Sequence, residues 1–264
     1  MLLTGLIVFS LLICFGVLAF QAVRIIWMPV IFAGSFIVGL LFWFGFCFAV
    51  TRLIDMNSPC TIPSTFYRWC ADVNLEFIMQ FLRMDVTVVG EQMLPQEKFM
   101  LAGKHRSVFD PMLAMLFLSE YNMGFVAKKE VSGYPVASRL MHKCFCLPLD
   151  RSSLKSEART ISTAAGLISS DTASIGIYPE GTRNTADEML PFMPGAFRMA
   201  KKADCPIVVT AVSGTDEVAH NFLRLRRTKI TMEYVGVLDR DEVRSSSTTE
   251  LSEKTRCMLE EALA

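Results

Sequence analysis

The start of this 264-residue chain is almost free of charge: its first 51 residues carry one charged side chain, Arg24. On either side of it, Leu2–Val23 and Ile25–Thr51 are uncharged runs, each longer than the ~20 residues that a membrane-spanning helix needs. The first run lacks the basic flank and the short apolar stretch of a secretory signal. We therefore expect an N-terminal hydrophobic helical hairpin, with its break near Arg24, at or in a membrane. A spanning hairpin and one that lies in a single leaflet both fit this pattern.

The rest of the chain has an ordinary charge balance. Subtracting Arg24 from the 26 lysines and arginines leaves 25 basic residues against 26 acidic ones. Nucleic-acid binding needs a basic excess, so we expect no nucleic-acid partner. Because lysine and arginine favour the cytoplasmic side of a membrane, we expect this body there, on a cell membrane. The eight cysteines form no C-x-x-C pair, which favours reduced thiols over a zinc site.

Beyond the uncharged runs, the apolar pattern predicts an α/β fold. Pro63–Met84 has helical spacing and predicts an amphipathic helix, which packs on the core or, as second choice, lies on a membrane surface. The predicted strands are Val86–Val89, Met100–Gly103, Gly124–Ala127, Cys146–Leu149, Ile175–Tyr178, Ile207–Val212 and a closing strand Ile230–Leu238. The predicted helices between them are Pro111–Leu118, Pro135–His142, Glu157–Ser169 and Gly195–Lys201. This alternation predicts a mostly parallel sheet flanked by helices.

These elements suggest three parts of the chain. Residues 1–52 form the hydrophobic membrane hairpin, residues 53–84 the amphipathic connecting helix, and residues 85–264 the α/β domain. Arg244–Glu250 is rich in serine and threonine, so we expect a loop there, before a short C-terminal helix.

Charged residues follow four of the predicted strands. They are Lys104-His105, Lys128-Lys129-Glu130, Asp150-Arg151 and Glu180-Gly181-Thr182-Arg183. Ligands bind outside the carboxyl ends of the strands in open α/β sheets. A single charged strand end is usually only solvated, but four around one histidine predict a site.

His105 and Asp110 form the first candidate pair. On a continuous helix, five residues would place them ~140° apart, so only a turn can bring them together. Asp110-Pro111 predicts a helix start with the aspartate as N-cap, leaving its second oxygen for the imidazole. A histidine oriented by a carboxylate is a general base, and here the substrate must supply the hydroxyl. The alternative is a capping aspartate beside an unrelated histidine.

The stretch "YPEGTRN" forms the second candidate motif. Arg183 suits planar recognition of a phosphate, and Gly181 lets a backbone N–H approach a ligand closely. A surface turn with an ion pair is the alternative reading.

HRSVFD together with PEGTR resembles the glycerophospholipid acyltransferase family, the PlsC-like 1-acylglycerol-3-phosphate acyltransferases. "FVAKKE", "CLPLDR" and "CPIVVTAV" are similar to three further blocks of that family, in the same order. The resemblance covers roughly Val86 to Val237, and the hydrophobic hairpin is typical of bacterial members.

The resemblance implies a function and assigns roles to residues. His105 is the catalytic base and Asp110 its partner. A fatty acyl group passes from a thioester of acyl carrier protein or coenzyme A to the sn-2 hydroxyl of lysophosphatidate in the bilayer, giving phosphatidate, with no metal and no other cofactor. The substrate-binding residues are Lys128, Arg151 and Arg183 on the phosphate, with Glu180, Gly181 and Thr182 around the same pocket.

The sequence departs from the family pattern at two places. No lysine precedes Gly195, and Lys104 stands where an uncharged polar residue is common. These differences keep other acceptors open, such as another lysophospholipid or a lyso-aminolipid. A membrane-anchored lipid-binding protein without turnover and a membrane-anchored scaffold are the alternatives from other classes.

Overall fold

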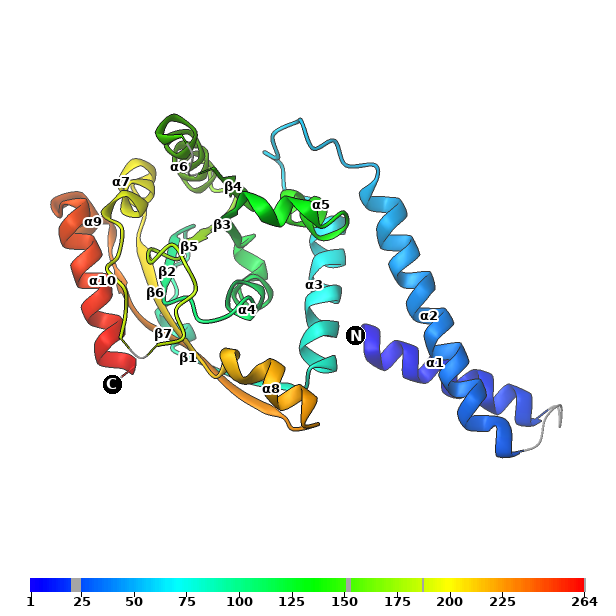
Figure 1. Cartoon of the computed structure of the whole chain (residues 1–264). Helices are drawn as coiled ribbons and strands as arrows, with labels where there is room; N and C mark the ends of the chain where they lie inside the picture. The colour runs from blue at the N-terminus through cyan, green and yellow to red at the C-terminus, as the bar shows by residue number, and fades with distance from the viewer. Residues whose placement is uncertain (20–24, 151–152, 187, 264) are drawn as a thin grey trace.

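The computed structural model describes residues 1–19, 25–150, 153–186 and 188–263. Its first part is a pair of apolar helices, α1 (Leu2–Ala19) and α2 (Met28–Thr51), with a short 3₁₀ turn at Ile25–Trp27. The helices pack closely where Leu6 lies over Gly39, since a Cβ on that glycine would come within 2.6 Å of the leucine. Both segments are long and apolar enough to cross a membrane by length and composition. The hairpin projects away from the sheet (Figure 1).

Helix α3 (Thr65–Phe81) follows this hairpin and confirms the helix predicted within Pro63–Met84. Ser64 is its N-cap, and the hydroxyl of this serine accepts a hydrogen bond from the Tyr67 N–H. One side packs on α2 through edge-to-face contacts such as Trp43 on Trp69, with ring centroids 5.6 Å apart. Its other side contributes Ala71 to the core beneath the sheet. The amphipathic pattern of α3 thus serves two apolar partners.

A seven-stranded sheet forms the centre of the body, in the order β1-β7-β6-β2-β5-β3-β4. Every neighbouring pair is parallel except β6 and β7, which confirms the mostly parallel prediction. The strands are β1 (Met84–Val89), β2 (Met100–Gly103), β3 (Gly124–Lys128), β4 (Leu147–Leu149), β5 (Ile175–Ile177), β6 (Ile207–Ser213) and β7 (Thr228–Leu238). All seven predicted strands are present.

Helices cover both faces of the sheet (Figure 1). Strand β2 is buried along its whole length because its residues alternate between two cores. Met100 and Ala102 face one core, and Leu101 faces the other. The first core lies under α6 (Leu154–Ser169), α7 (Arg198–Ala203) and α10 (Thr248–Leu263). The second lies under α3 and α4 (Phe109–Phe117), beside α5 (Ala137–Lys143) and α8 (Val218–Leu223).

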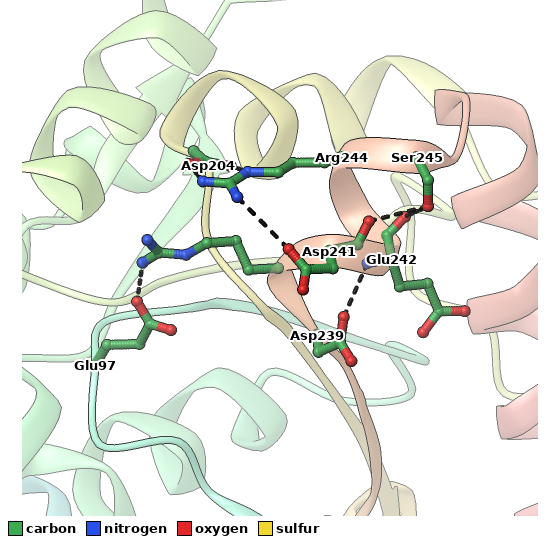
Figure 2. A network of polar contacts seen from close by, with 8 residues as sticks. Glu97, Asp204, Asp239, Asp241, Glu242, Arg244 and Ser245 are labelled. Atoms are coloured by element: carbon green, nitrogen blue, oxygen red, sulfur yellow. Dashed lines mark hydrogen bonds and ion pairs between the residues drawn. The ribbon is translucent and has the colours of Figure 1, made fainter.

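The end of the chain differs from the prediction. Most of Arg244–Glu250, predicted as a loop, belongs to two helices, α9 (Arg240–Ser245) and α10, and α10 is sixteen residues long rather than short. Polar contacts hold α9: Asp239 caps it by accepting the Glu242 N–H at 2.8 Å, and Arg244 Nε donates to Asp204 at 2.6 Å (Figure 2). This network adjoins the start of β6, so it lies at the edge of the sheet opposite to the carboxyl ends of the parallel strands.

Candidate active site

The carboxyl ends of four neighbouring parallel strands bring the predicted site residues to one edge of the sheet. In the order β2-β5-β3-β4, His105 follows β2, Glu180 follows β5, Lys128 ends β3 and Asp150 follows β4. Neighbouring strands lie about 4.8 Å apart. The glutamate motif is therefore one strand from His105, whereas the lysine is two strands away.

His105 and Asp110 are in contact, through a turn rather than a helix. His105 Nδ1 lies 2.9 Å from Asp110 Oδ2, and the carboxylate is fully buried while the imidazole is 19% exposed. The same oxygen accepts the backbone N–H groups of Arg106 and Ser107, both at 2.7 Å. The Asp110 carboxylate therefore holds the loop after β2 in a turn and fixes the orientation of the His105 ring.

The prediction that Asp110 caps helix α4 is wrong. The helix begins at Phe109, one residue earlier, with Val108 in the capping position and no side-chain cap. Asp110 thus lies in the first turn, where an acidic residue is favoured by the helix dipole. Its Oδ2 is instead bonded to three donors of the preceding loop, the His105 ring and the N–H groups of Arg106 and Ser107.

The second oxygen of Asp110 has a partner that no motif in the sequence indicated. Thr215, fully buried after β6, donates its hydroxyl to Oδ1. Next to it, Asp216 forms an ion pair with Arg106 at 3.0 Å. Thr215 is distant from Asp110 in the chain, and only the pairing of β6 beside β2 brings them together. With this bond, Asp110 accepts four hydrogen bonds.

Aromatic rings stack on one face of the His105 imidazole. Tyr178 stacks on His105 with ring centroids 4.3 Å apart and an interplanar angle of 11°, and Phe125 stacks on the far side of Tyr178 at 5.5 Å. Gly176 makes room for this stack, since a Cβ there would lie 2.3 Å from the Phe125 ring. Burial, together with the charge of Asp110, holds the pKa of Tyr178 well above its ordinary value, so the phenol stays neutral. The sequence places Tyr178 directly before PEGTR, but nothing in the pattern indicates a stacking role.

The loop after β5 is built around Glu180 and Asn184. The Glu180 side chain is buried, and its Oε2 accepts from Asn184 Nδ2 at 2.9 Å and from the Leu190 N–H at 3.1 Å. Gly181 has a φ of 72°, the left-handed conformation that favours glycine. The Asn184 N–H donates to the carbonyl oxygen of His105 at 2.7 Å, which fastens this loop directly to the histidine. Asn184 was not selected from the sequence.

Two basic residues beside His105 also hold this loop. Lys104 is 1% exposed, and its ammonium donates to the Ala186 carbonyl at 2.7 Å. Arg106 donates to the Thr185 carbonyl at 3.2 Å. The departure from the family pattern at Lys104 is therefore a structural contact between the two motifs.

The predicted phosphate ligands are unevenly placed. Arg183 and Thr182 are exposed on the same loop as Asn184, and Arg183 has no ion pair within the described ranges. Lys128 is exposed at the end of β3, and its neighbour Lys129 pairs with Asp150 at 3.0 Å. Arg151 lies outside the described residues. The structure therefore brings Arg183 near His105 through the Asn184 contact, and leaves Lys128 farther along the edge.

This arrangement has the parts of a proton-transfer site. A carboxylate holds one nitrogen of an imidazole, a neutral ring supports its face, and a loop with an exposed guanidinium is bonded to its backbone. Among the described residues, no hydroxyl side chain forms a hydrogen bond with the His105 ring, which bonds to Asp110. The acceptor of such a site has to bring its own hydroxyl.

Comparison with known proteins agrees with this geometry. Residues 85–213 match the family described as Acyltransferase. The chain is 30% identical over 189 residues to a 1-acyl-sn-glycerol-3-phosphate acyltransferase of Haemophilus influenzae, covering 66% of this chain and 77% of that protein. It is 32% identical over 137 residues to the protein of that name from Saccharomyces cerevisiae, covering 51% of this chain and 45% of the relative.

A solved structure has the same fold. The 1-acyl-sn-glycerophosphate acyltransferase PlsC of Thermotoga maritima superposes with a TM-score of 0.60 at 20% identity, covering 84% of this chain and 87% of that one. The chain spans about half the length of several of the curated relatives that it matches. On the similarity to the Haemophilus influenzae protein over most of its length, the chain belongs to the PlsC-like 1-acyl-sn-glycerol-3-phosphate acyltransferase family.

Proposed function

We propose that the protein transfers a fatty acyl group from an acyl thioester to the sn-2 hydroxyl of 1-acylglycerol 3-phosphate, giving phosphatidate. The observation that carries this proposal is the pair His105 and Asp110 at 2.9 Å, joined to the loop of Arg183 by the Asn184 N–H. The relatives' names supply the acceptor, and the geometry supplies the means of activating it.

Asp110 sets the tautomer of the histidine. An ionised carboxylate only accepts hydrogen bonds, so the proton between Asp110 Oδ2 and His105 lies on Nδ1. The lone pair is then on Nε2. The imidazole is partly exposed, and this nitrogen has no hydrogen-bond partner within the described part of the chain. It is available to accept the proton of a lipid hydroxyl.

The transfer proceeds without a covalent acyl-enzyme. As the acceptor oxygen attacks the thioester carbonyl, its proton passes to Nε2 and a tetrahedral oxyanion forms. The C–S bond then breaks, and the imidazolium returns the proton to the departing thiolate. Hydrogen-bond donors have to stabilise the oxyanion. The N–H groups of Arg106 and Ser107 are already bonded to Asp110, so they are not those donors.

Arg183 is the first candidate for binding the acceptor phosphate. It is exposed, it lies one strand from His105, and its guanidinium can form two parallel bonds with a phosphate. Lys128 and Arg151 follow as more distant candidates along the same edge. Glu180, expected around the same pocket, contributes by shaping the loop that carries Arg183, through its bonds to Asn184 and Leu190.

The apolar helices α1 and α2 suit an acceptor and a product that lie in a bilayer. We place the hairpin in a cell membrane and the catalytic domain on its cytoplasmic side, where acyl carrier protein and coenzyme A thioesters are found. The anchor would confine the enzyme's search for its acceptor to the membrane plane.

An assay of the full chain in detergent or vesicles tests the proposal. We expect transfer from acyl thioesters on either carrier to lysophosphatidate, and much slower transfer to monoacylglycerol, which lacks the phosphate. His105→Ala should remove about two to four orders of magnitude of kcat, the range of general base catalysis. His220→Ala, at an exposed histidine on α8, is the matched control and should keep full activity.

A second pair of variants tests the phosphate site. Arg183→Ala should raise KM for lysophosphatidate by about 10- to 150-fold, which corresponds to the ~1.5–3 kcal/mol of a hydrogen-bonded charged group. Arg159→Ala, at an exposed arginine on α6, should leave KM unchanged. Equal rates with the phosphate-free acceptor would assign the site to another lysolipid. An unchanged KM in the Arg183 variant would exclude Arg183 as the phosphate ligand and leave Lys128 and Arg151 as the candidates. Lipid binding without any turnover would support the non-catalytic alternative.

A further inference from the structure

The turn between α8 and β7 exposes apolar and basic side chains together. We name Leu223–Arg227 the Leu-Arg turn. Its two leucines are 83% and 76% exposed, and the three arginines among them, Arg224, Arg226 and Arg227, are exposed as well. No apolar surface of the described body covers these leucines, so their burial requires something outside the domain.

The turn has a defined conformation. The N–H groups of Arg224 and Arg226 donate to the Asn221 carbonyl at 3.1 and 2.9 Å, and the Leu225 N–H donates to Phe222 at 2.9 Å. Leu225 has a φ of 56°, an unusual conformation for a branched side chain. The guanidinium of Arg83, in the turn between α3 and β1, donates to the Leu225 carbonyl. Backbone hydrogen bonds therefore hold Leu225 in an unfavourable conformation that leaves its side chain exposed.

The positive charge of the turn is not neutralised by the protein. Within the part of the chain that the structure describes, none of the three arginines forms an ion pair. Lys229, two residues beyond, lies opposite Asp85 in the register of β1 and β7. An anionic partner is the chemical complement of such a turn.

The position of the turn links it to both the hairpin and the active site. The Phe222 ring lies 5.4 Å from that of Phe81, the last residue of α3, which is itself half exposed. Helix α3 packs on α2 of the apolar hairpin, so α3 connects the turn to the hairpin. The turn adjoins the lower end of α3 in Figure 1. In the other direction, α8 starts three residues after Thr215, the donor to Asp110.

We propose that the Leu-Arg turn is a second membrane contact, separate from the hairpin, which docks on an anionic bilayer surface. Its leucines enter the interface while its arginines bind lipid phosphates. An acidic protein such as the acyl carrier protein would complement the arginines, but it offers no reason for two leucines to be held outward beside them. A third attachment point beyond the two hairpin helices fixes the tilt of the domain, and with it the direction of the loop that bears His105.

Hydrogen–deuterium exchange of the full chain tests this contact. We expect peptides covering residues 218–230 to exchange more slowly in vesicles of phosphatidylcholine with phosphatidylglycerol than in phosphatidylcholine alone. Leu223→Ser/Leu225→Ser and Arg224→Gln/Arg226→Gln/Arg227→Gln should each remove that protection. The control Arg198→Gln/Lys202→Gln/Arg256→Gln removes the same charge from α7 and α10, on the other face of the sheet, and should keep it.

Activity gives a second readout. With the acceptor embedded in anionic vesicles, each turn variant should lose at least about threefold in rate, since a single arginine near an anionic surface contributes about fivefold in partitioning. With a short-chain acceptor dissolved without vesicles, the rate should match that of the unmodified chain. Equal exchange in both vesicle types overturns the proposal. So does protection that appears only with acyl carrier protein, which would assign the turn to the donor. If the unmodified chain did not transfer acyl groups to the dissolved acceptor, that result would instead count against the proposed function.

Discussion

Replacing Asp110 by asparagine separates the charge of this residue from its hydrogen bonds. The carboxylate accepts three donors on Oδ2 and the Thr215 hydroxyl on Oδ1. An asparagine can place its carbonyl oxygen at the first position and its NH₂ at the second. The hydroxyl of Thr215 can then rotate to accept instead of donating. Every bond is kept, so the fold should tolerate Asp110→Asn.

What this substitution removes is the negative charge beside the imidazolium that forms during the transfer. A hydrogen bond to a charged partner exceeds a neutral one by about 1–2 kcal/mol, and two unit charges 4 Å apart near a protein surface interact by about 4 kcal/mol. We therefore expect kcat to fall by roughly 10- to 1,000-fold. The Tm should change little.

Asp110→Ala is the contrasting variant. It leaves four donors without their acceptor in a buried loop, and each unpaired buried group costs about 1–3 kcal/mol. Steady-state kinetics with lysophosphatidate and thermal unfolding of the same preparations compare the two. An asparagine variant with the original kcat would refute the role of the charge. One that unfolds as readily as the alanine variant would refute the hydrogen-bond assignment.

Substitutions at three further positions probe the surroundings of the pair. Tyr178→Phe keeps the ring stacked on His105 and should retain kcat, whereas Tyr178→Leu should lower kcat several-fold with little change in KM, as steady-state kinetics would show. Asn184→Ala loosens the loop that carries Arg183 and should raise KM for lysophosphatidate more than it lowers kcat; a loss of kcat alone would contradict this. Lys104→Met removes the ammonium bonded to the following motif's loop and should cost about 1–3 kcal/mol in the free energy of unfolding, measured with denaturant.

The local pattern of the sequence was sufficient for the elements and the layers of the fold. Short apolar runs bounded by polar turns predicted every strand, because a strand buried on both faces has to be apolar throughout, as Met100–Gly103 is. The pattern failed at residues whose partners are distant. Arg244–Glu250 has the composition of a loop, yet α9 is stabilised by Asp204 and by its own cap at Asp239.

The site divides in the same way. The sequence by itself determined that His105, Asp110 and Arg183 stand at strand ends and therefore at one edge, because parallel strands end together. Only the tertiary structure decided what surrounds them: Thr215 on the carboxylate, Tyr178 beneath the imidazole, and the tie from Asn184 to the histidine backbone. Residues that are close in the chain can be recognised as a motif from their spacing. Contacts between strands depend on the order in which the sheet is assembled, and that order is set by packing over the whole domain.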